Sequence, residues 1–276
     1  MREQNYWWYV AMGAAMGATV AAGTAAIVAR LQDRGRLPGG ATLPKLPSPA
    51  DDVFVLAPEW GVIRTEHVLP LQHALERSPE SIGLVIHTLG GTILAVDHIA
   101  HMLRHVQGKV TVYVPYMALS GGTMIALAAD EIVMEPSAIL GPVDPQIDGW
   151  PAVGILEVVE RKPPESVDDE WVLLAAESRK ALKETRDTVR ALVDSEAAVE
   201  RLTSGATTHA RPITYGEAHT LGLPVRLGVP PELVLAVDNL VSQAPKWGCF
   251  PPIMISAEHG AGVSRTRLAS LRASTS

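Results

Sequence analysis

Residues 113–129 read Tyr113-Val-Pro-Tyr-Met-Ala-Leu-Ser-Gly-Gly-Thr-Met-Ile-Ala-Leu-Ala-Ala129. The apolar, β-branched run that leads into this stretch predicts a strand ending at Pro115, and the small apolar residues after Ser120-Gly-Gly122 predict a helix. A strand, a tight turn and a helix in this order place the Ser120 hydroxyl at the positive end of a helix, beside glycines that leave room for a substrate. Ser120 is therefore a candidate nucleophile, although Ser-Gly-Gly also occurs in ordinary loops.

A second stretch of the same design lies about thirty residues earlier in the chain. It reads Ile82-Gly-Leu-Val-Ile-His-Thr-Leu-Gly-Gly-Thr-Ile-Leu-Ala-Val96, a buried-type strand followed by a glycine pair and a helix. Backbone N–H groups at the start of a helix lack intrahelical partners and can stabilise developing negative charge. We therefore expect the N–H groups of Gly91 and Gly121 to form an oxyanion hole for acyl transfer at Ser120.

Three motifs resemble the serine dehydrogenase proteinase family. They are His87-Thr-Leu-Gly-Gly91, the run from Ser120 to Met134, and Leu140-Gly-Pro-Val-Asp-Pro-Gln146. The family is related to signal peptide peptidase A and to the proteolytic subunit of the Clp protease, within the ClpP/crotonase superfamily. The resemblance covers about residues 50–228 and implies an α/β fold of repeated ββα units, a serine peptidase site and, by analogy, a homo-oligomer.

A serine nucleophile needs a base that removes its proton. A Clp-type triad would place a histidine about 25 residues after the serine, by analogy with the family. Position 145 is Pro145, and no histidine lies between His105 and His209. Asp144, within the third motif, resembles a residue of loop or oligomer contacts more than a catalytic acid. The sequence therefore does not support a histidine triad.

The signal peptide peptidase A relatives use lysine, and the resemblance implies that Lys180 takes this role. Lys180 falls on a predicted long helix, where Val172, Leu173 and Ala176 are compatible with a desolvated face. Lys183 remains an alternative, and a solvated helix lysine without a catalytic role remains another. Lys162 stands in what reads as a solvated turn.

The remaining pattern alternates strands and helices, which predicts an α/β architecture with mainly parallel strands. We expect strands at 60–63, 82–87, 109–114 and 131–134, helices around 68–75, 92–105 and 123–129, and one long helix over 168–202. A short helix capped by Thr214 and ending at Gly222 then leads to a last strand.

Composition excludes several classes of protein. The single cysteine, Cys249, excludes an intrachain disulfide, and a net charge of −7 with five Tyr and two Phe argues against a nucleic-acid surface. His98, His101 and His105 share one helix face, but no fourth metal ligand is evident, so we interpret them as a solvated or partner-facing stripe. No dinucleotide-binding glycine loop is present, and we expect neither a metal nor a cofactor.

Residues 7–29 carry no charge over 23 positions, which is long enough for a membrane span of about 20 residues. Aromatic residues gather at the start of this stretch, as in an interfacial belt. Arg30, Arg34 and Arg36 follow it while Arg2 precedes it, which favours a single-pass protein of the cell membrane with a cytoplasmic catalytic domain. We expect an anchor over 1–36, a proline-rich linker over 37–58, the peptidase domain over 59–244 and a flexible tail over 245–276.

Together these expectations describe a membrane-anchored serine peptidase with a Ser120–Lys180 dyad. Its substrates would be peptide bonds in membrane-associated or unfolded protein segments. Two other classes stay open, namely a crotonase-like enzyme acting on acyl-CoA and a membrane scaffold without enzymatic activity.

Overall fold

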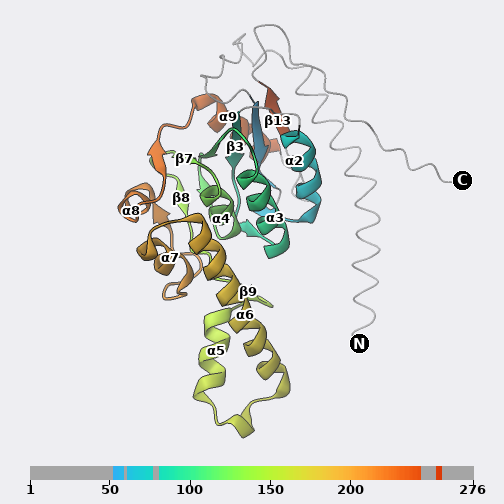
Figure 1. Ribbon diagram of the computed structural model, residues 1–276, viewed down its shortest axis with the longest axis vertical. Helices are drawn as coiled ribbons and strands as arrows, with labels where there is room; N and C mark the ends of the chain where they lie inside the picture. Colours follow the sequence, from blue (N-terminus) through green and yellow to red (C-terminus); the bar gives the residue numbers. More distant parts are fainter. Residues whose placement is uncertain (1–51, 59–60, 77–80, 244–252, 257–276) are drawn as a thin grey trace, which may run out of the picture. The chain divides into compact units, whose positions relative to one another are not determined.

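A six-stranded sheet forms the centre of the fold (Figure 1). The computed structural model describes residues 52–58, 61–76, 81–243 and 253–256. The strand order is β12-β7-β5-β3-β1-β13, and neighbours among the first five of these are parallel. The strands are β1 (Asp52–Leu56), β3 (Ser81–Ile86), β5 (Lys109–Val114), β7 (Glu131–Met134), β12 (Val225–Leu227) and β13 (Ile253–Ser256).

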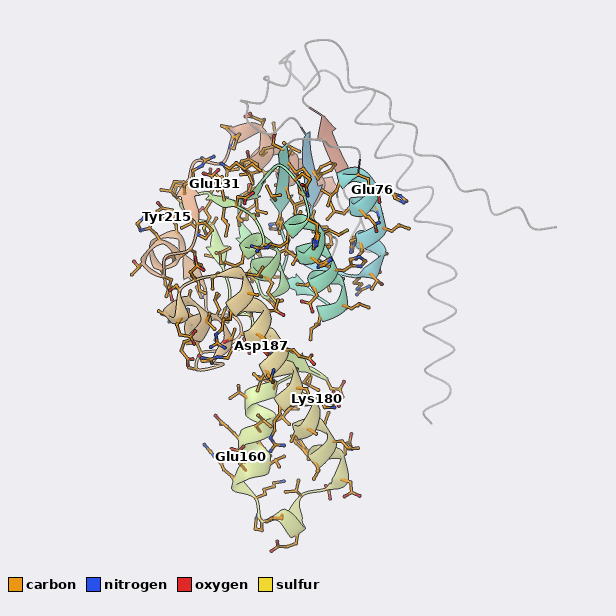
Figure 2. The ribbon with its side chains drawn as sticks, in the orientation of Figure 1. Glu76, Glu131, Glu160, Lys180, Asp187 and Tyr215 are labelled. Carbon is orange, nitrogen blue, oxygen red and sulfur yellow. The ribbon has the colours of Figure 1, made fainter. Side chains whose placement is uncertain are left out.

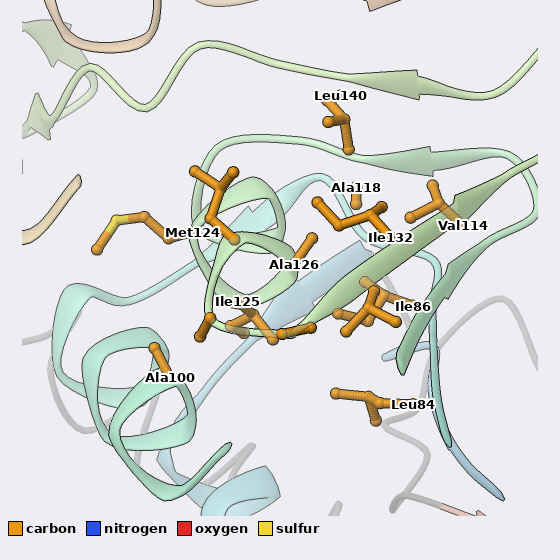
Figure 3. Packing of buried hydrophobic residues seen from close by; sticks show 14 of the residues in the cluster. Leu84, Ile86, Ala100, Val114, Ala118, Met124, Ile125, Ala126, Ile132 and Leu140 are labelled. Carbon is orange, nitrogen blue, oxygen red and sulfur yellow. The ribbon is translucent and has the colours of Figure 1, made fainter. Parts of the chain in front are cut away.

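Helices connect the parallel strands and cover the sheet, as parallel strands require. Between them lie α2 (Val68–Leu75), α3 (Ile93–Arg104) and α4 (Gly121–Leu127). All seven residues of α4 are buried. Figure 3 shows α4 in the core, with Ile132 and Ala118 packed near it and Ala100 of α3 on its other side. The expected α/β class is confirmed, and so are the strands and helices predicted between residues 82 and 134.

Five short strands form two small sheets beside the main one. A three-stranded sheet has the order β11-β8-β6, formed by β11 (Ile213–Thr214), β8 (Ile139–Leu140) and β6 (Met117–Ala118). A separate parallel pair joins β2 (Val62–Ile63) to β4 (Gly90–Gly91). These short strands hold the two glycine-containing turns and the segment after Leu140 in fixed register.

A helical hairpin follows the small strands β9 (Gln146–Ile147) and β10 (Trp150–Pro151). It comprises α5 (Ala152–Arg161), the 3₁₀ turn η3 (Pro164–Ser166) and the first part of α6 (Asp169–Leu192). Figure 1 shows this hairpin extending away from the sheet. Helix α5 was not expected from the sequence, because its apolar residues are flanked by glycines and prolines.

The single long helix expected over 168–202 is two helices. α6 ends at Leu192, and α7 (Glu196–Thr203) begins after Ser195, whose hydroxyl accepts a hydrogen bond from Ala198 N at 3.2 Å. The apolar spacing continues through the break, but Ser195 satisfies a free N–H group and starts a new helix.

The closing part of the domain contains α8 (Tyr215–Thr220) and α9 (Pro231–Gln243). Thr214 caps α8 as predicted, by accepting a hydrogen bond from Glu217 N at 3.4 Å. The sheet also includes strands in segments that were expected to lie outside the domain: β1 lies in the expected linker, and β13 lies in the expected tail. Prolines and glycines flank the short apolar run of each strand, so the sequence did not indicate a strand at either place.

The expected membrane anchor over residues 1–36 lies outside the described residues. Within the part of the chain that the structure describes, no helix is both long enough and apolar enough to cross a membrane.

Candidate active site

Ser120 occupies a strained turn between β6 and α4. It is the residue before the first turn of α4 and has φ +51° and ψ −119°, a backbone conformation that L-residues rarely adopt. Its side chain makes no capping hydrogen bond to the helix, and the residue is only partly buried. The Ser120 hydroxyl is therefore not engaged in capping the helix, and it stays available for chemistry.

The turn that contains Gly90 lies directly against Ser120. A Cβ atom on Gly90 would lie 2.9 Å from Ser120 Cβ and 3.3 Å from its Oγ, and the φ of Gly90 is +133°. The two turns are joined by backbone hydrogen bonds, because Thr88 N donates to Met117 O at 3.1 Å and Leu119 N donates to Thr88 O at 3.0 Å. The closeness of Ser120 therefore requires a glycine at position 90, whereas Gly91 leaves room for Ile63, whose carbonyl oxygen would lie 2.5 Å from a Cβ at position 91.

The expected oxyanion donors meet at the same place. A Cβ atom on Gly121 would lie 3.3 Å from Gly91 N, so the backbone of Gly91 approaches the first residue of α4. Gly121 is the first helical residue, and its N–H group therefore has no partner four residues earlier within the helix. The structure thus brings Ser120, Gly91 and Gly121 together, while their roles as nucleophile and oxyanion hole stay a prediction.

Buried hydrogen bonds of Thr123 lock this turn to the segment after β8. The Thr123 hydroxyl is fully buried, donates to Ala118 O at 2.6 Å or Gly141 O at 3.0 Å, and accepts from Gly141 N at 3.0 Å. Gly141 also packs against Leu119, because a Cβ on this glycine would lie 3.4 Å from Leu119 Cα. The Leu140-Gly-Pro motif is therefore a direct support of the serine turn.

Lys180 does not meet Ser120 in the single chain. Its side chain is 63% exposed and its Nζ lies 2.7 Å from Glu177 Oε1. The Glu177 carboxylate raises the pKa of Lys180, which keeps the amine charged. Figure 2 shows Lys180 on the part of α6 that runs beside α5, and no hydrogen bond or ion pair joins it to Ser120.

The expected apolar surroundings of Lys180 are also solvated. Val172 is 50% exposed and Leu173 is 69% exposed. Lys183 is similar to Lys180, since it is exposed and paired with Asp187 at 2.6 Å, and that carboxylate raises its pKa. Lys162 is exposed beyond the end of α5. The assignment of Lys180 as the base therefore stays a prediction, and the single chain does not provide the burial that it needs.

A hydrogen-bonded pair joins Asp144, in the segment after β8, to His209, in the segment before β11. His209 Nδ1 is 2.8 Å from Asp144 Oδ1, and Gln146 Nε2 donates to Asp144 Oδ2 at 2.9 Å. The hydrogen bond to Asp144 raises the pKa of His209. The sequence suggested loop or oligomer contacts for Asp144 and no role for His209. To predict this pair, one would have needed to know that β11 pairs with β8, because that pairing joins the two segments.

The other histidine cluster is a surface feature. His98, His101 and His105 are exposed, and the rings of His101 and His105 lie 4.1 Å apart. Within the described part of the chain, no group of three or more His, Cys, Asp or Glu residues is arranged to hold a metal ion.

A nucleophile-type turn at Ser120 beside backbone donors on an α/β sheet defines the class as that of serine hydrolases. More specifically, the chain belongs to the family of ClpP-like SDH-type serine proteinases, whose model matches residues 57–246. This confirms the resemblance drawn from the three motifs.

Two proteins of one organism are similar to this chain in sequence. The protein MJ0137 of Methanocaldococcus jannaschii is 37% identical over 215 residues, covering 74% of this chain and 75% of the relative. MJ1495 of the same organism is 41% identical over 186 residues, covering 64% and 63%.

Two solved structures are more distantly similar. A serine-to-alanine mutant of the 1510-N membrane-bound stomatin-specific protease matches with a TM-score of 0.43 and 19% identity, over 66% of this chain and 80% of that one. An asparagine-to-aspartate mutant of ClpP1 from Listeria monocytogenes matches with a TM-score of 0.44 and 16% identity, over 66% and 94%.

Proposed function

We propose that this protein is a serine peptidase whose nucleophile is Ser120 and whose oxyanion hole consists of the N–H groups of Gly91 and Gly121. The observation that carries the proposal is the positive φ of Ser120 directly against Gly90. A strained backbone persists only where the surrounding structure enforces it, and such positions gather at active sites. Membership in the serine proteinase family supports the same reaction class.

The reaction begins when Ser120 Oγ attacks the carbonyl carbon of the peptide bond. The carbonyl electrons move onto oxygen, where the Gly91 and Gly121 N–H groups stabilise the negative charge by about 3 kcal/mol per donor. A base accepts the serine proton and returns it to the amine nitrogen as the C–N bond breaks. Water then attacks the carbonyl carbon of the acyl-enzyme, the base takes the water proton, and that proton goes to Ser120 Oγ as the ester bond breaks and the carboxylic acid product leaves.

From the family resemblance, we propose that Lys180 is this base and forms a Ser–Lys dyad with Ser120. A lysine acts as a base only when desolvation or neighbouring cations lower its pKa. In the single chain Glu177 has the opposite effect on Lys180. The dyad therefore requires an assembled state in which another surface buries Lys180 and displaces Glu177. A homo-oligomer would provide such a surface.

We also propose that residues 7–29 anchor the protein in the cell membrane, with the catalytic domain on the cytoplasmic side. The support is the uncharged stretch and the arginines that follow it. An anchored peptidase meets protein segments that are in or near the membrane, and these or unfolded segments are the proposed substrates.

A fluorophosphonate probe tests the reaction class on the full chain. We expect the probe to form a covalent adduct on Ser120 that mass spectrometry locates, and Ser120→Ala to remove it. Ser166→Ala is the matched control, because Ser166 is an exposed turn serine bonded to Pro163 O. Failure of the unmodified chain to react, or an adduct elsewhere that survives Ser120→Ala, contradicts the proposal and leaves the acyl-CoA and scaffold alternatives.

A further inference from the structure

Two histidines lie together at the carboxyl-terminal end of α3. His101 is in the last turn of this helix, and His105 directly follows its last residue. Side chains four residues apart lie one above the other on the same helix face. The ring centroids of the two histidines are 4.1 Å apart, with an angle of 42° between the ring planes, and both residues are exposed. The single chain therefore holds two imidazole rings side by side at its surface.

A hydrogen bond fixes the tautomer of His105. Its Nδ1 atom lies 2.8 Å from the backbone oxygen of His101. A carbonyl oxygen only accepts hydrogen bonds, so Nδ1 carries the proton and donates it. In the neutral ring Nε2 is then unprotonated, with its lone pair free. Histidines that bind metal ions almost always donate their other ring N–H group to a carbonyl or a carboxylate in this way.

The spacing of the rings suits one metal ion between them. Zinc binds histidine nitrogens at about 2.0–2.1 Å, so two nitrogens of a tetrahedral zinc site are about 3.3 Å apart. The 4.1 Å between the ring centroids is close to this separation, and exposed side chains adjust their rotamers within nanoseconds. Two histidines at positions i and i+4 of one helix face are also how helical zinc sites hold their metal. His101 and His105 thus have the geometry of a chelate.

The surrounding charges favour a cation at this place. The free carbonyl groups at the end of a helix carry a partial negative charge. Asp97 lies one turn before His101, and its Oδ1 is buried without a hydrogen-bond partner in the described part of the chain. Burial and the Glu184 carboxylate raise the pKa of Asp97, and a cation nearby would offset the repulsion between the two acids. Arg104 is exposed and opposes a cation, but it is one positive charge against two carboxyl groups and a helix end.

We infer that His101 and His105 bind a divalent transition metal ion of the zinc class, with Nε2 of His105 as one ligand. Imidazole suits Zn²⁺, Cu²⁺ and Ni²⁺, whereas Mg²⁺ and Ca²⁺ take oxygen ligands. No group of three or more His, Cys, Asp or Glu residues in the described ranges is arranged to hold a metal. The remaining coordination positions therefore belong to water or to a donor from another molecule. A two-histidine chelate needs no third or fourth ligand from the chain, which was the objection raised by the sequence.

This site is separate from the serine turn and does not depend on the peptidase reaction. Helix α3 has 12 residues, so the pair lies roughly 18 Å along the helix from the Gly91 turn at 1.5 Å per residue. A metal ion that binds the folded chain stabilises it by mass action. Ala100 of α3 packs beside α4 (Figure 3), so a metal at the end of α3 holds a helix that supports the core. We therefore expect the metal to act on stability and not on the reaction.

Calorimetric titration of the full chain with zinc chloride, after a chelator has been added and removed, tests the site. We expect saturable binding of Zn²⁺ and none of Mg²⁺. His101→Gln and His105→Gln should each weaken zinc binding by at least about 10-fold, because even the loss of a group that only supports a metal ligand costs that much. His219→Gln is the matched control, since His219 is an exposed histidine of α8, and it should keep the affinity of the unmodified chain.

Thermal unfolding provides a second readout. Zinc should raise the unfolding temperature of the unmodified chain and of His219→Gln, and should raise it less in the two pair variants. Without metal, the unfolding temperatures of all four proteins show whether each variant is folded. Absence of zinc binding by the unmodified chain would overturn the inference, and so would binding that survives either pair substitution at full strength. Loss of fluorophosphonate labelling at Ser120 would instead contradict the peptidase proposal and leave the metal site standing.

Discussion

Gly90 leaves no room for a side chain beside Ser120, since a Cβ there would lie 2.9 Å from Ser120 Cβ. The same glycine has φ +133°, which only glycine adopts without strain. The close approach of the two turns and the backbone conformation at position 90 thus both require glycine. The geometry of the serine turn requires it as well.

Gly90→Ala should therefore damage the site more than the fold. We expect about 1–3 kcal/mol of destabilisation from the strained backbone. Displacing Ser120 by about 1 Å should slow labelling by about 10²-fold. Probe labelling and urea unfolding measure the two effects. Gly216→Ala is the control, because nothing lies within 4 Å of its added Cβ and it sits inside α8. Full activity in Gly90→Ala would refute the close packing of the two turns.

Thr123→Val should destabilise the domain because it removes one buried hydroxyl group. Valine has a similar shape, but it leaves the Gly141 N–H group without the acceptor that Thr123 Oγ1 provides at 3.0 Å. An unsatisfied buried donor costs about 1–3 kcal/mol of unfolding free energy. We also expect slower labelling, because the hydroxyl joins the serine turn to Gly141. Thr220→Val, on the exposed face of α8, should change stability by less than about 0.5 kcal/mol; equal effects of the two substitutions would contradict this role of the Thr123 hydroxyl.

Ser195→Ala tests the break between α6 and α7. The serine hydroxyl accepts from Ala198 N, so its loss should lower the free energy of unfolding by about 1 kcal/mol. Ser195→Asp retains an acceptor at the start of a helix and should keep most of the stability. Urea denaturation of the three proteins gives the comparison. An alanine variant as stable as the aspartate variant would mean that the cap does not separate the helices.

The sequence was sufficient where local chemistry determines structure. The β-branched runs that became β3, β5 and β7 are continuous and buried, and the glycines beside Ser120 mark a backbone approach that leaves no space for side chains. It was insufficient where distant segments meet. The pairing of Asp144 with His209 spans 65 residues and depends on the register of β8 with β11, which no local pattern encodes. Lys180 illustrates the same difficulty, because helix spacing alone does not reveal whether another surface covers it.

Lys180→Gln tests the proposed base of the dyad. Glutamine cannot accept the serine proton, so the substitution should slow fluorophosphonate labelling of Ser120 by at least about 10²-fold, the usual contribution of a general base. Lys183→Gln is the matched control, because Lys183 is also exposed and paired with a carboxylate, that of Asp187 at 2.6 Å. Labelling at the unmodified rate in Lys180→Gln would contradict the dyad, and loss of labelling in Lys183→Gln alone would assign the base to Lys183.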